Sequence, residues 1–163
     1  MSVNVTKGFT RVTTYQEYDL GHFTVIGGIG YTYVYNAGAD ATAVADVVQV
    51  FDTTLAMGHV SVTAATTLAN SDGTTAGGTP AGVAVSVMAT TTYGWLWSWG
   101  HSLTNTITTD GNVVAGPMAV LDTAKIAVLG VPANHHCKFG ISTAADSSTT
   151  ATGAILFNCM WAN

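Results

Sequence analysis

Apolar and polar residues alternate along most of this chain, whereas the spacing of an amphipathic helix is almost nowhere present. Alternation with a period of two is typical of β-strands, because successive side chains of a strand point to opposite faces of the sheet. The alternation predicts strands within residues 23–38, 46–51, 59–63, 82–88, 93–100 and 154–161. We therefore expect an all-β fold, a compact β-barrel or β-sandwich of short antiparallel strands.

Aromatic residues occupy the alternating positions of two of these segments. Three of the four tryptophans lie within TYGWLWSWGH, and a period of two places four rings on one face of that strand: Tyr93, Trp95, Trp97 and Trp99. The segment IGYTYVYN places three tyrosines on one face in the same way: Tyr31, Tyr33 and Tyr35. We call these two sets the tryptophan ladder and the tyrosine ladder.

A face of aromatic rings serves as a platform for sugars, as part of a core, or as a contact between subunits. Each ring buries about 150–250 Å², which corresponds to roughly 4–6 kcal/mol of hydrophobic free energy. Four rings left in water would forfeit that free energy and would exceed the apolar patch that a monomer tolerates. We therefore expect a core or a subunit contact, and a sugar platform is the less favoured alternative.

Turn-forming residues predict how the later strands are connected. The pair Asp110-Gly111 predicts a tight hairpin, because a type I′ turn needs positive φ at both central residues. Gly116-Pro117 predicts the end of a strand, and residues 118–124 are expected to form one helical turn or a loop, of which the loop is favoured. The last strand, 154–161, is apolar on nearly both faces, so we expect it to be central in a sheet or covered by a neighbour.

The chain divides into two parts of unequal size. Residues 1–20 are expected to form an extended N-terminal arm, which gains order when a partner holds it. Residues 21–163 are expected to form a single β domain, since a chain of 163 residues is long enough for one core.

Charge is the unusual feature of the composition. Only 8% of the residues are charged, against roughly 25% in a typical soluble protein. A surface so poor in charge suggests that copies of the chain or a larger assembly cover much of it; a Thr-rich surface, as on exported β-proteins, is the alternative. The net charge of −5 and four basic residues argue against direct nucleic-acid binding, and no apolar run reaches the length of a membrane span.

Residues that carry chemistry do not form a recognisable constellation. His135-His136-Cys137 is the one tight cluster, but neighbouring strand residues face opposite ways, so it supplies at most two ligands of a metal site. Cys137 and Cys159 read as small buried residues, and a single bridge between them stays open. No nucleophile elbow and no paired carboxylates are present. We expect no enzyme activity, no cofactor and no metal.

The second half of the chain carries a series of short motifs. In order they are Ala81-Gly82-Val83-Ala84-Val85, Tyr93-Gly94-Trp95, Gly100, Asp110-Gly111, Ala115-Gly116, Gly130, Phe139-Gly140, Ala145-Asp146 and Ala154-Ile155. This series, over about residues 81–160, resembles the capsid decoration, or cement, proteins of tailed bacteriophages. Two features depart from that family, namely Trp97 where a polar residue is common and the N-terminal half with its tyrosine ladder.

The resemblance implies a structural virion protein. It implies a homo-oligomer, most often a trimer, that is assembled in the host cytoplasm, binds the outside of an icosahedral head and clamps major capsid protein subunits. On this reading the arm contacts the capsid through five residues: Lys7, Phe9, Arg11, Tyr15 and Tyr18. The alternatives are a carbohydrate-binding β-module that uses the tryptophan ladder, and another virion component of the tail or baseplate.

Overall fold

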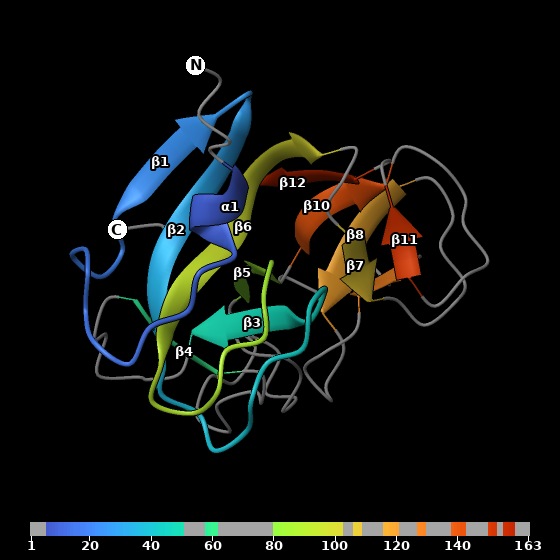
Figure 1. The fold of residues 1–163 in the computed structure, drawn as a ribbon. Coiled ribbons are helices and arrows are strands. Elements are labelled where there is room, and N and C mark those ends of the chain that lie inside the picture. Colours follow the sequence, from blue (N-terminus) through green and yellow to red (C-terminus); the bar gives the residue numbers. More distant parts are fainter. Residues whose placement is uncertain are drawn as a thin grey trace.

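The fold is described from a computed structural model of the chain (Figure 1). The structure describes residues 6–50, 58–61, 80–102, 106–108, 116–120, 127–129, 138–142, 150–152 and 155–158, with side chains over 8–46, 48, 58–60 and 81–100. The elements are α1 (Thr6–Phe9), β1 (Phe23–Ile26), β2 (Ile29–Asn36), β3 (Val47–Val50), β4 (His59–Ser61), β5 (Pro80–Ala84), β6 (Tyr93–Ser102), β7 (Thr106–Thr108), β8 (Gly116–Val120), β9 (Ala127–Leu129), β10 (Lys138–Ser142), β11 (Thr150–Thr152) and β12 (Ile155–Asn158).

The prediction of an all-β fold is confirmed. Ten strands form one sheet in the order β1-β2-β4-β3-β5-β6-β12-β10-β8-β9, and β7 pairs with β11 in a second, two-stranded sheet. The pairings are antiparallel except the one between β2 and β4, which is parallel. In Figure 1 the strands β1, β2 and β6 lie side by side, and β12, β10 and β8 continue from β6.

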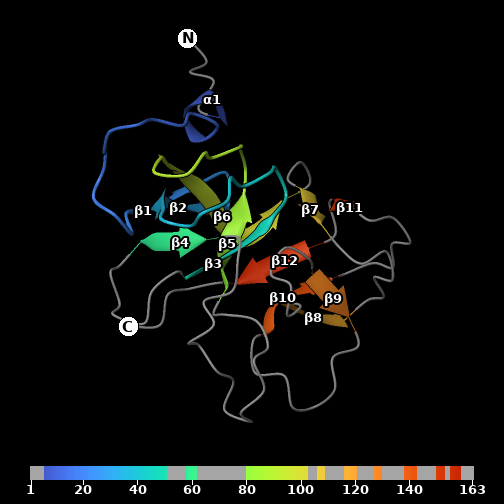
Figure 2. The same ribbon diagram turned by 90° about the horizontal axis from the view of Figure 1, so that it is seen from below.

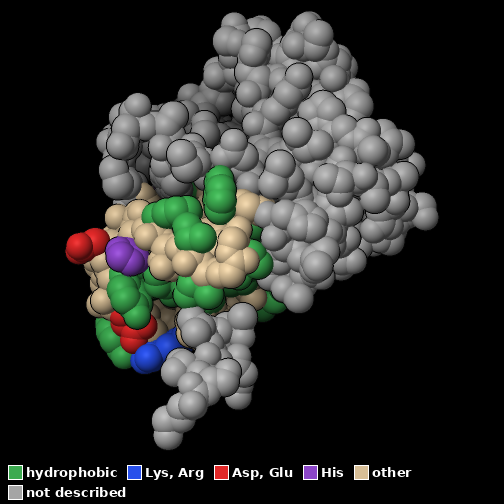
Figure 3. Space-filling view, turned by 90° about the horizontal axis from the view of Figure 1, so that it is seen from above, with side chains coloured by type: hydrophobic (Ala, Val, Ile, Leu, Met, Phe, Trp, Pro, Cys, Tyr) green, Lys and Arg blue, Asp and Glu red, His purple; other side chains and the backbone are tan. Residues whose placement is uncertain are grey.

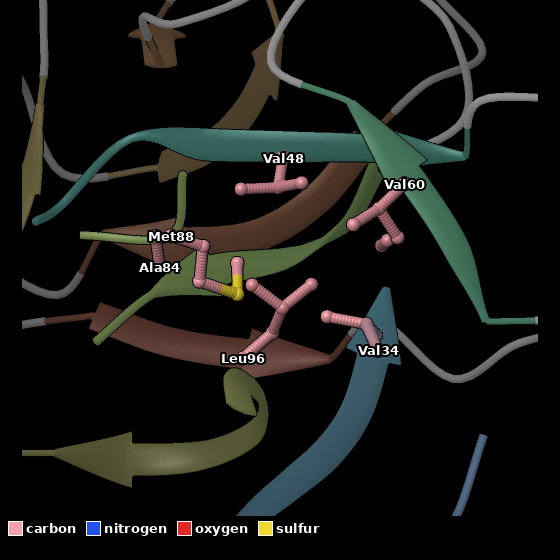
Figure 4. Packing of buried hydrophobic residues seen from close by; sticks show 7 residues of the cluster. Val34, Val48, Val60, Ala84, Met88 and Leu96 are labelled. Atoms are coloured by element: carbon pink, nitrogen blue, oxygen red, sulfur yellow. The ribbon is translucent and has the colours of Figure 1, made fainter. Parts of the chain in front are cut away.

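Five of these strands enclose the described core. Pairing runs from β2 to β4, β3, β5 and β6 and returns to β2. The core cluster contains seven buried residues: Val34, Val48, Val60, Ala81, Ala84, Met88 and Leu96. All of them except Ala81 are labelled in Figure 4. Val34 and Leu96 alternate with the ladder residues along β2 and β6, so the core lies on one face of these strands and the ladders lie on the other.

Met88 reaches this core because Gly94 leaves room for it. A Cβ atom at Gly94 would lie 2.6 Å from the Met88 sulfur, which is closer than atoms approach in real structures. The predicted strand over residues 82–88 is wrong beyond Ala84, where β5 ends. The Thr42 hydroxyl donates to the Ser86 carbonyl oxygen and accepts from the Met88 amide, and these bonds hold the segment in a loop that turns Met88 inward.

Two expectations for the second half of the chain are corrected or sharpened. Gly116-Pro117 does not end a strand, because both residues belong to β8, which also includes residues 118–120. Pro117 pairs with Ile141 of β10, whereas the β9 pairing begins only at Met118. The last strand, β12, is central between β6 and β10, as expected. Asp110-Gly111 lies outside the described residues.

Candidate functional site

The two aromatic ladders are direct neighbours in the sheet. In the antiparallel pair of β2 and β6, three partners face each other: Tyr31 with Trp97, Tyr33 with Trp95, and Tyr35 with Tyr93. The ring centroids are 5.1 Å apart for Tyr33 and Trp95 and 4.8 Å apart for Tyr35 and Tyr93. Cross-strand aromatic pairs of this kind stabilise a sheet, and the sequence alone did not show that the two ladders pair.

Trp99 leaves the face that the alternation predicts for it. The register between β2 and β6 shifts between Gly30 and Tyr31, so that Trp99 stands opposite Gly30 while Trp97 stands opposite Tyr31. One step along β2 therefore matches two steps along β6, which reverses the side on which Trp99 lies. A Cβ atom on Gly30 would lie 2.8 Å from the Trp99 Cβ, which confirms that Trp99 shares the face of Gly30.

A buried hydroxyl pair sits at this irregularity. The Thr32 and Ser98 hydroxyl oxygens lie 2.6 Å apart and share a hydrogen bond. Both residues are almost fully buried. The Trp97 side chain is also fully buried, and its Nε1 donates to the Trp99 carbonyl oxygen. Trp97 is thus fixed in the interior, whereas Trp99 is 38% exposed.

The N-terminal segment covers the ladder face of the sheet. The Phe9 ring stacks on Tyr31 at 4.3 Å and meets the edge of Trp95 at 5.0 Å. Farther along, Thr13 pairs with Tyr93 through two backbone hydrogen bonds. Figure 2 shows α1 on one side of β2 and β6 and β3 on the other. The N-terminal arm was expected to be extended, but Thr6–Phe9 forms a helical turn, and this turn carries Phe9 onto the rings.

The other arm residues named by the sequence have different surroundings. Arg11 forms an ion pair of 2.9 Å with Glu17 and donates to the Tyr15 hydroxyl. Tyr15 is 58% exposed, and the Tyr18 ring contacts Trp95 at 5.3 Å. The Lys7 side chain lies outside the described residues. Arg11 and Tyr15 are thus the members of this set that stand on the described surface without packing on the ladders.

Two hollows adjoin the edge of the tryptophan ladder. The first has a volume of about 250 Å³ and is lined by Gly8, Phe9, Tyr18, His22, Thr24 and Trp95. The second has a volume of about 440 Å³ and is lined by Gln16, Glu17, Tyr18, Asp19 and His22. Tyr18 and His22 line both hollows, so the aromatic hollow and the polar hollow are neighbours.

The polar residues of these hollows were not predicted as site residues. Gln16, Glu17, Asp19 and His22 lie more than seventy positions before Trp95 in the sequence. They reach it because the Gly21 amide donates to the Tyr33 carbonyl oxygen and the Tyr33 amide donates to the His22 carbonyl oxygen. The sequence does show Glu17, Asp19 and His22 clustered around Tyr18. It does not show that this cluster lies beside Trp95, because that position depends on Tyr33, the cross-strand partner of Trp95.

An exposed apolar strip lies on the opposite face of the same strands. Val25 faces Gly30 across β1 and β2, and Gly30 faces Trp99 across β2 and β6. The Phe23 ring lies over Gly30, where a Cβ atom would approach it to 2.6 Å. Phe23 is 44% and Val25 50% exposed. We call Phe23, Val25 and Trp99 the apolar strip; Figure 3 shows hydrophobic side chains on the described part of the upper surface.

The described residues contain no group of three or more His, Cys, Asp or Glu side chains placed to hold a metal ion. Within the same part of the chain, no helix is long and apolar enough to cross a membrane. His135, His136, Cys137 and Cys159 lie outside the described residues. Comparison of the chain with protein-family models, with curated proteins and with solved structures gives no match.

Proposed function

We propose that this chain is a structural virion protein of the capsid decoration type. It associates with copies of itself, binds the outer surface of an icosahedral phage head and stabilises contacts between major capsid protein subunits. The motif series over residues 81–160 supports this choice of partner. The edge of the sheet at β1, together with the apolar strip, is the observation that carries the proposed mode of action.

Strand β1 is an unprotected edge among the described strands. It stands first in the sheet order and pairs with β2. Its sequence, Phe-Thr-Val-Ile, contains neither a charged residue nor a proline. Proteins usually protect an edge strand with lysines, prolines or bulges, because its free backbone groups otherwise pair with another chain. An edge without these features favours pairing with a second copy of the chain.

The apolar strip extends this edge into a surface. Two of its side chains come from β1 and one from β6, with β2 between these strands, and each is more than a third exposed. Apolar and aromatic side chains are enriched in the cores of subunit contacts, and the charge-poor surface of this chain reduces the loss of charge hydration on association. We assign the strip to contact between copies, with a trimer as the expected assembly.

The two proposed contacts lie on opposite sides of the sheet. The strip shares the face of Gly30, whereas the segment of Phe9 and Tyr18 packs on the face of Tyr31 and Trp95. Exposed Tyr15 and Arg11 belong to that second segment. A subunit can therefore contact its copies and the capsid at once, and an oligomer with several weak capsid contacts binds through avidity.

The self-contact is tested by the oligomeric state in solution, measured by size-exclusion chromatography with light scattering. The unsubstituted chain should be a trimer, and the double variant Val25→Ser and Trp99→Ser should be a monomer of unchanged circular dichroism. Val87→Ser is the matched control, because Val87 is 59% exposed and lies outside the strip. A monomeric unsubstituted chain, or a double variant that stays trimeric, would refute the assignment of the strip.

The capsid role is tested separately by counting copies in purified particles of the phage that encodes the chain. Decoration requires a copy number close to that of the major capsid protein. A few copies per particle would support the tail or baseplate alternative instead, and absence from particles would refute a virion role altogether.

A further inference from the structure

Four aromatic rings form a box around the smaller hollow. Its floor is Trp95, which is 5% exposed, and its walls are Phe9, Tyr18 and His22. The walls stand steeply on the floor: the interplanar angles to Trp95 are 80° for Phe9, 60° for Tyr18 and 75° for His22. We call this arrangement the aromatic box.

The sheet holds the floor of the box, and hydrogen bonds hold two of its walls. Tyr33 lies beside the Trp95 ring at 5.1 Å, and its hydroxyl accepts from the Glu17 amide, one residue before Tyr18. The backbone of His22 is bound to Tyr33, and the Tyr18 and His22 rings stack at 5.7 Å. The rings are therefore positioned before a ligand arrives, which lowers the entropy that binding loses.

The second hollow, beside the box, carries negative charge. Glu17 and Asp19 line the adjoining hollow, which shares Tyr18 and His22 with the box. Glu17 is paired with Arg11, whereas Asp19 forms no side-chain ion pair within the described residues. A carboxylate without an ion-pair partner beside the box favours a cation over an anion there.

We propose that the aromatic box binds a quaternary ammonium group. The faces of aromatic rings carry negative partial charge and attract a cation, and several rings around one cation are the usual means of holding alkylated ammonium groups. A methylated ammonium also loses less hydration than a compact primary ammonium when rings enclose it. The volume of about 250 Å³ suits one such head group rather than a drug-sized ligand. This inference does not depend on the proposed virion function.

A sugar is less well matched to the box. Stacking of a sugar needs a broad, flat and open ring face, whereas the three wall rings stand at 60–80° to Trp95, so the box offers no such face. The ladder platform considered from the sequence offers no open face either, since Trp97 is fully buried and Trp99 lies on the other face. The remaining polar groups favour positive charge, because two of the residues that line the second hollow are carboxylates.

The test is an NMR titration of the full chain. The probes are choline and its neutral isostere 3,3-dimethylbutan-1-ol, with potassium chloride added to equalise ionic strength, and methyl glucoside as the sugar. We expect choline to shift the Trp95 indole signal and to bind about tenfold more tightly than the isostere, since cation–π attraction requires the charge.

Four variants locate the binding. Tyr18→Leu removes a wall and should weaken choline binding about five- to tenfold, whereas Tyr18→Phe keeps the ring and should bind like the unsubstituted chain. Asp19→Asn should weaken binding about threefold. Tyr15→Leu is the matched control, because Tyr15 is an exposed tyrosine of the same segment that lines neither hollow, and it should leave the affinity unchanged.

Three results would overturn the inference. Equal affinity for the isostere would show an apolar pocket without preference for charge. Binding of methyl glucoside without binding of choline would assign the site to carbohydrate. An equal loss of affinity in the Tyr15→Leu and Tyr18→Leu variants would place the bound choline outside the aromatic box.

Discussion

The hydrogen bond between Thr32 and Ser98 predicts a specific pattern in a double-mutant cycle. The two hydroxyl oxygens lie 2.6 Å apart, and the residues are 2% and 1% exposed. Thr32→Val and Ser98→Ala each remove one partner and leave the other buried without a described hydrogen bond, which costs about 1–3 kcal/mol. The double variant leaves no orphaned hydroxyl, so its cost should fall below the sum of the single costs by about 1–2 kcal/mol.

Urea unfolding followed by circular dichroism measures the four free energies of the cycle. The slopes with denaturant should agree among the four proteins, because the fold and the surface exposed on unfolding stay the same. Costs that add to within about 0.5 kcal/mol would refute the reasoning, since residues without contact behave in that way. Such a result would also show that the hydroxyl pair does not stabilise the register shift between β2 and β6 that leaves Trp99 exposed.

Three further predictions concern the hydrogen bonds, the backbone and the N-terminal cover. Asn36 is fully buried, and its Nδ2 donates to three carbonyl oxygens. Asn36→Asp replaces this donor by a carboxylate and should lower the free energy of unfolding, measured by urea titration at neutral pH, by about 3 kcal/mol or more. A loss below about 1 kcal/mol would contradict this prediction. Thr91 has a φ of 59°, a conformation that Asn adopts more readily than Thr. Thr91→Asn should therefore raise the free energy of unfolding by about 1 kcal/mol and raise the thermal midpoint with it, whereas Thr90→Asn should raise neither. Phe9→Ala should lower stability by about 2 kcal/mol and increase acrylamide quenching of tryptophan fluorescence, and unchanged quenching would show that Phe9 does not cover Trp95.

The alternation of the sequence predicts the strands well where local pattern decides. Tyr33 and Trp95 lie on the ladder face and Val34 and Leu96 in the core, as a period of two requires. The prediction fails for Trp99, because the shift arises where β6 meets Gly30 on a strand about seventy positions earlier. Glycines inside strands often mark such irregularities, but a glycine does not tell which partner residue is displaced.

The aromatic box lay beyond sequence reasoning for a related reason. The sequence neighbours of the tryptophan ladder supply few carboxylates or amides. The structure brings Gln16, Glu17 and Asp19 to a hollow that shares Tyr18 and His22 with the hollow lined by Trp95, through pairing of the Gly21–His22 backbone with Tyr33. Local pattern thus predicts the face on which a ring lies, whereas the composition of a site depends on which distant segment crosses that face.

In β1, neighbouring side chains face either the packed ladder face or the proposed contact between copies. Thr24 pairs with Tyr31 and is partly buried on the ladder face, where it also lines the aromatic hollow, whereas Phe23 and Val25 point the other way and are exposed. Polar substitutions at Phe23 or Val25 therefore change the surface offered to another copy while the ladder face keeps its packing. Strand β1 contains no charged residue and no proline, so the same alternation that builds the interior also supplies the edge to which we assign the proposed contact between copies.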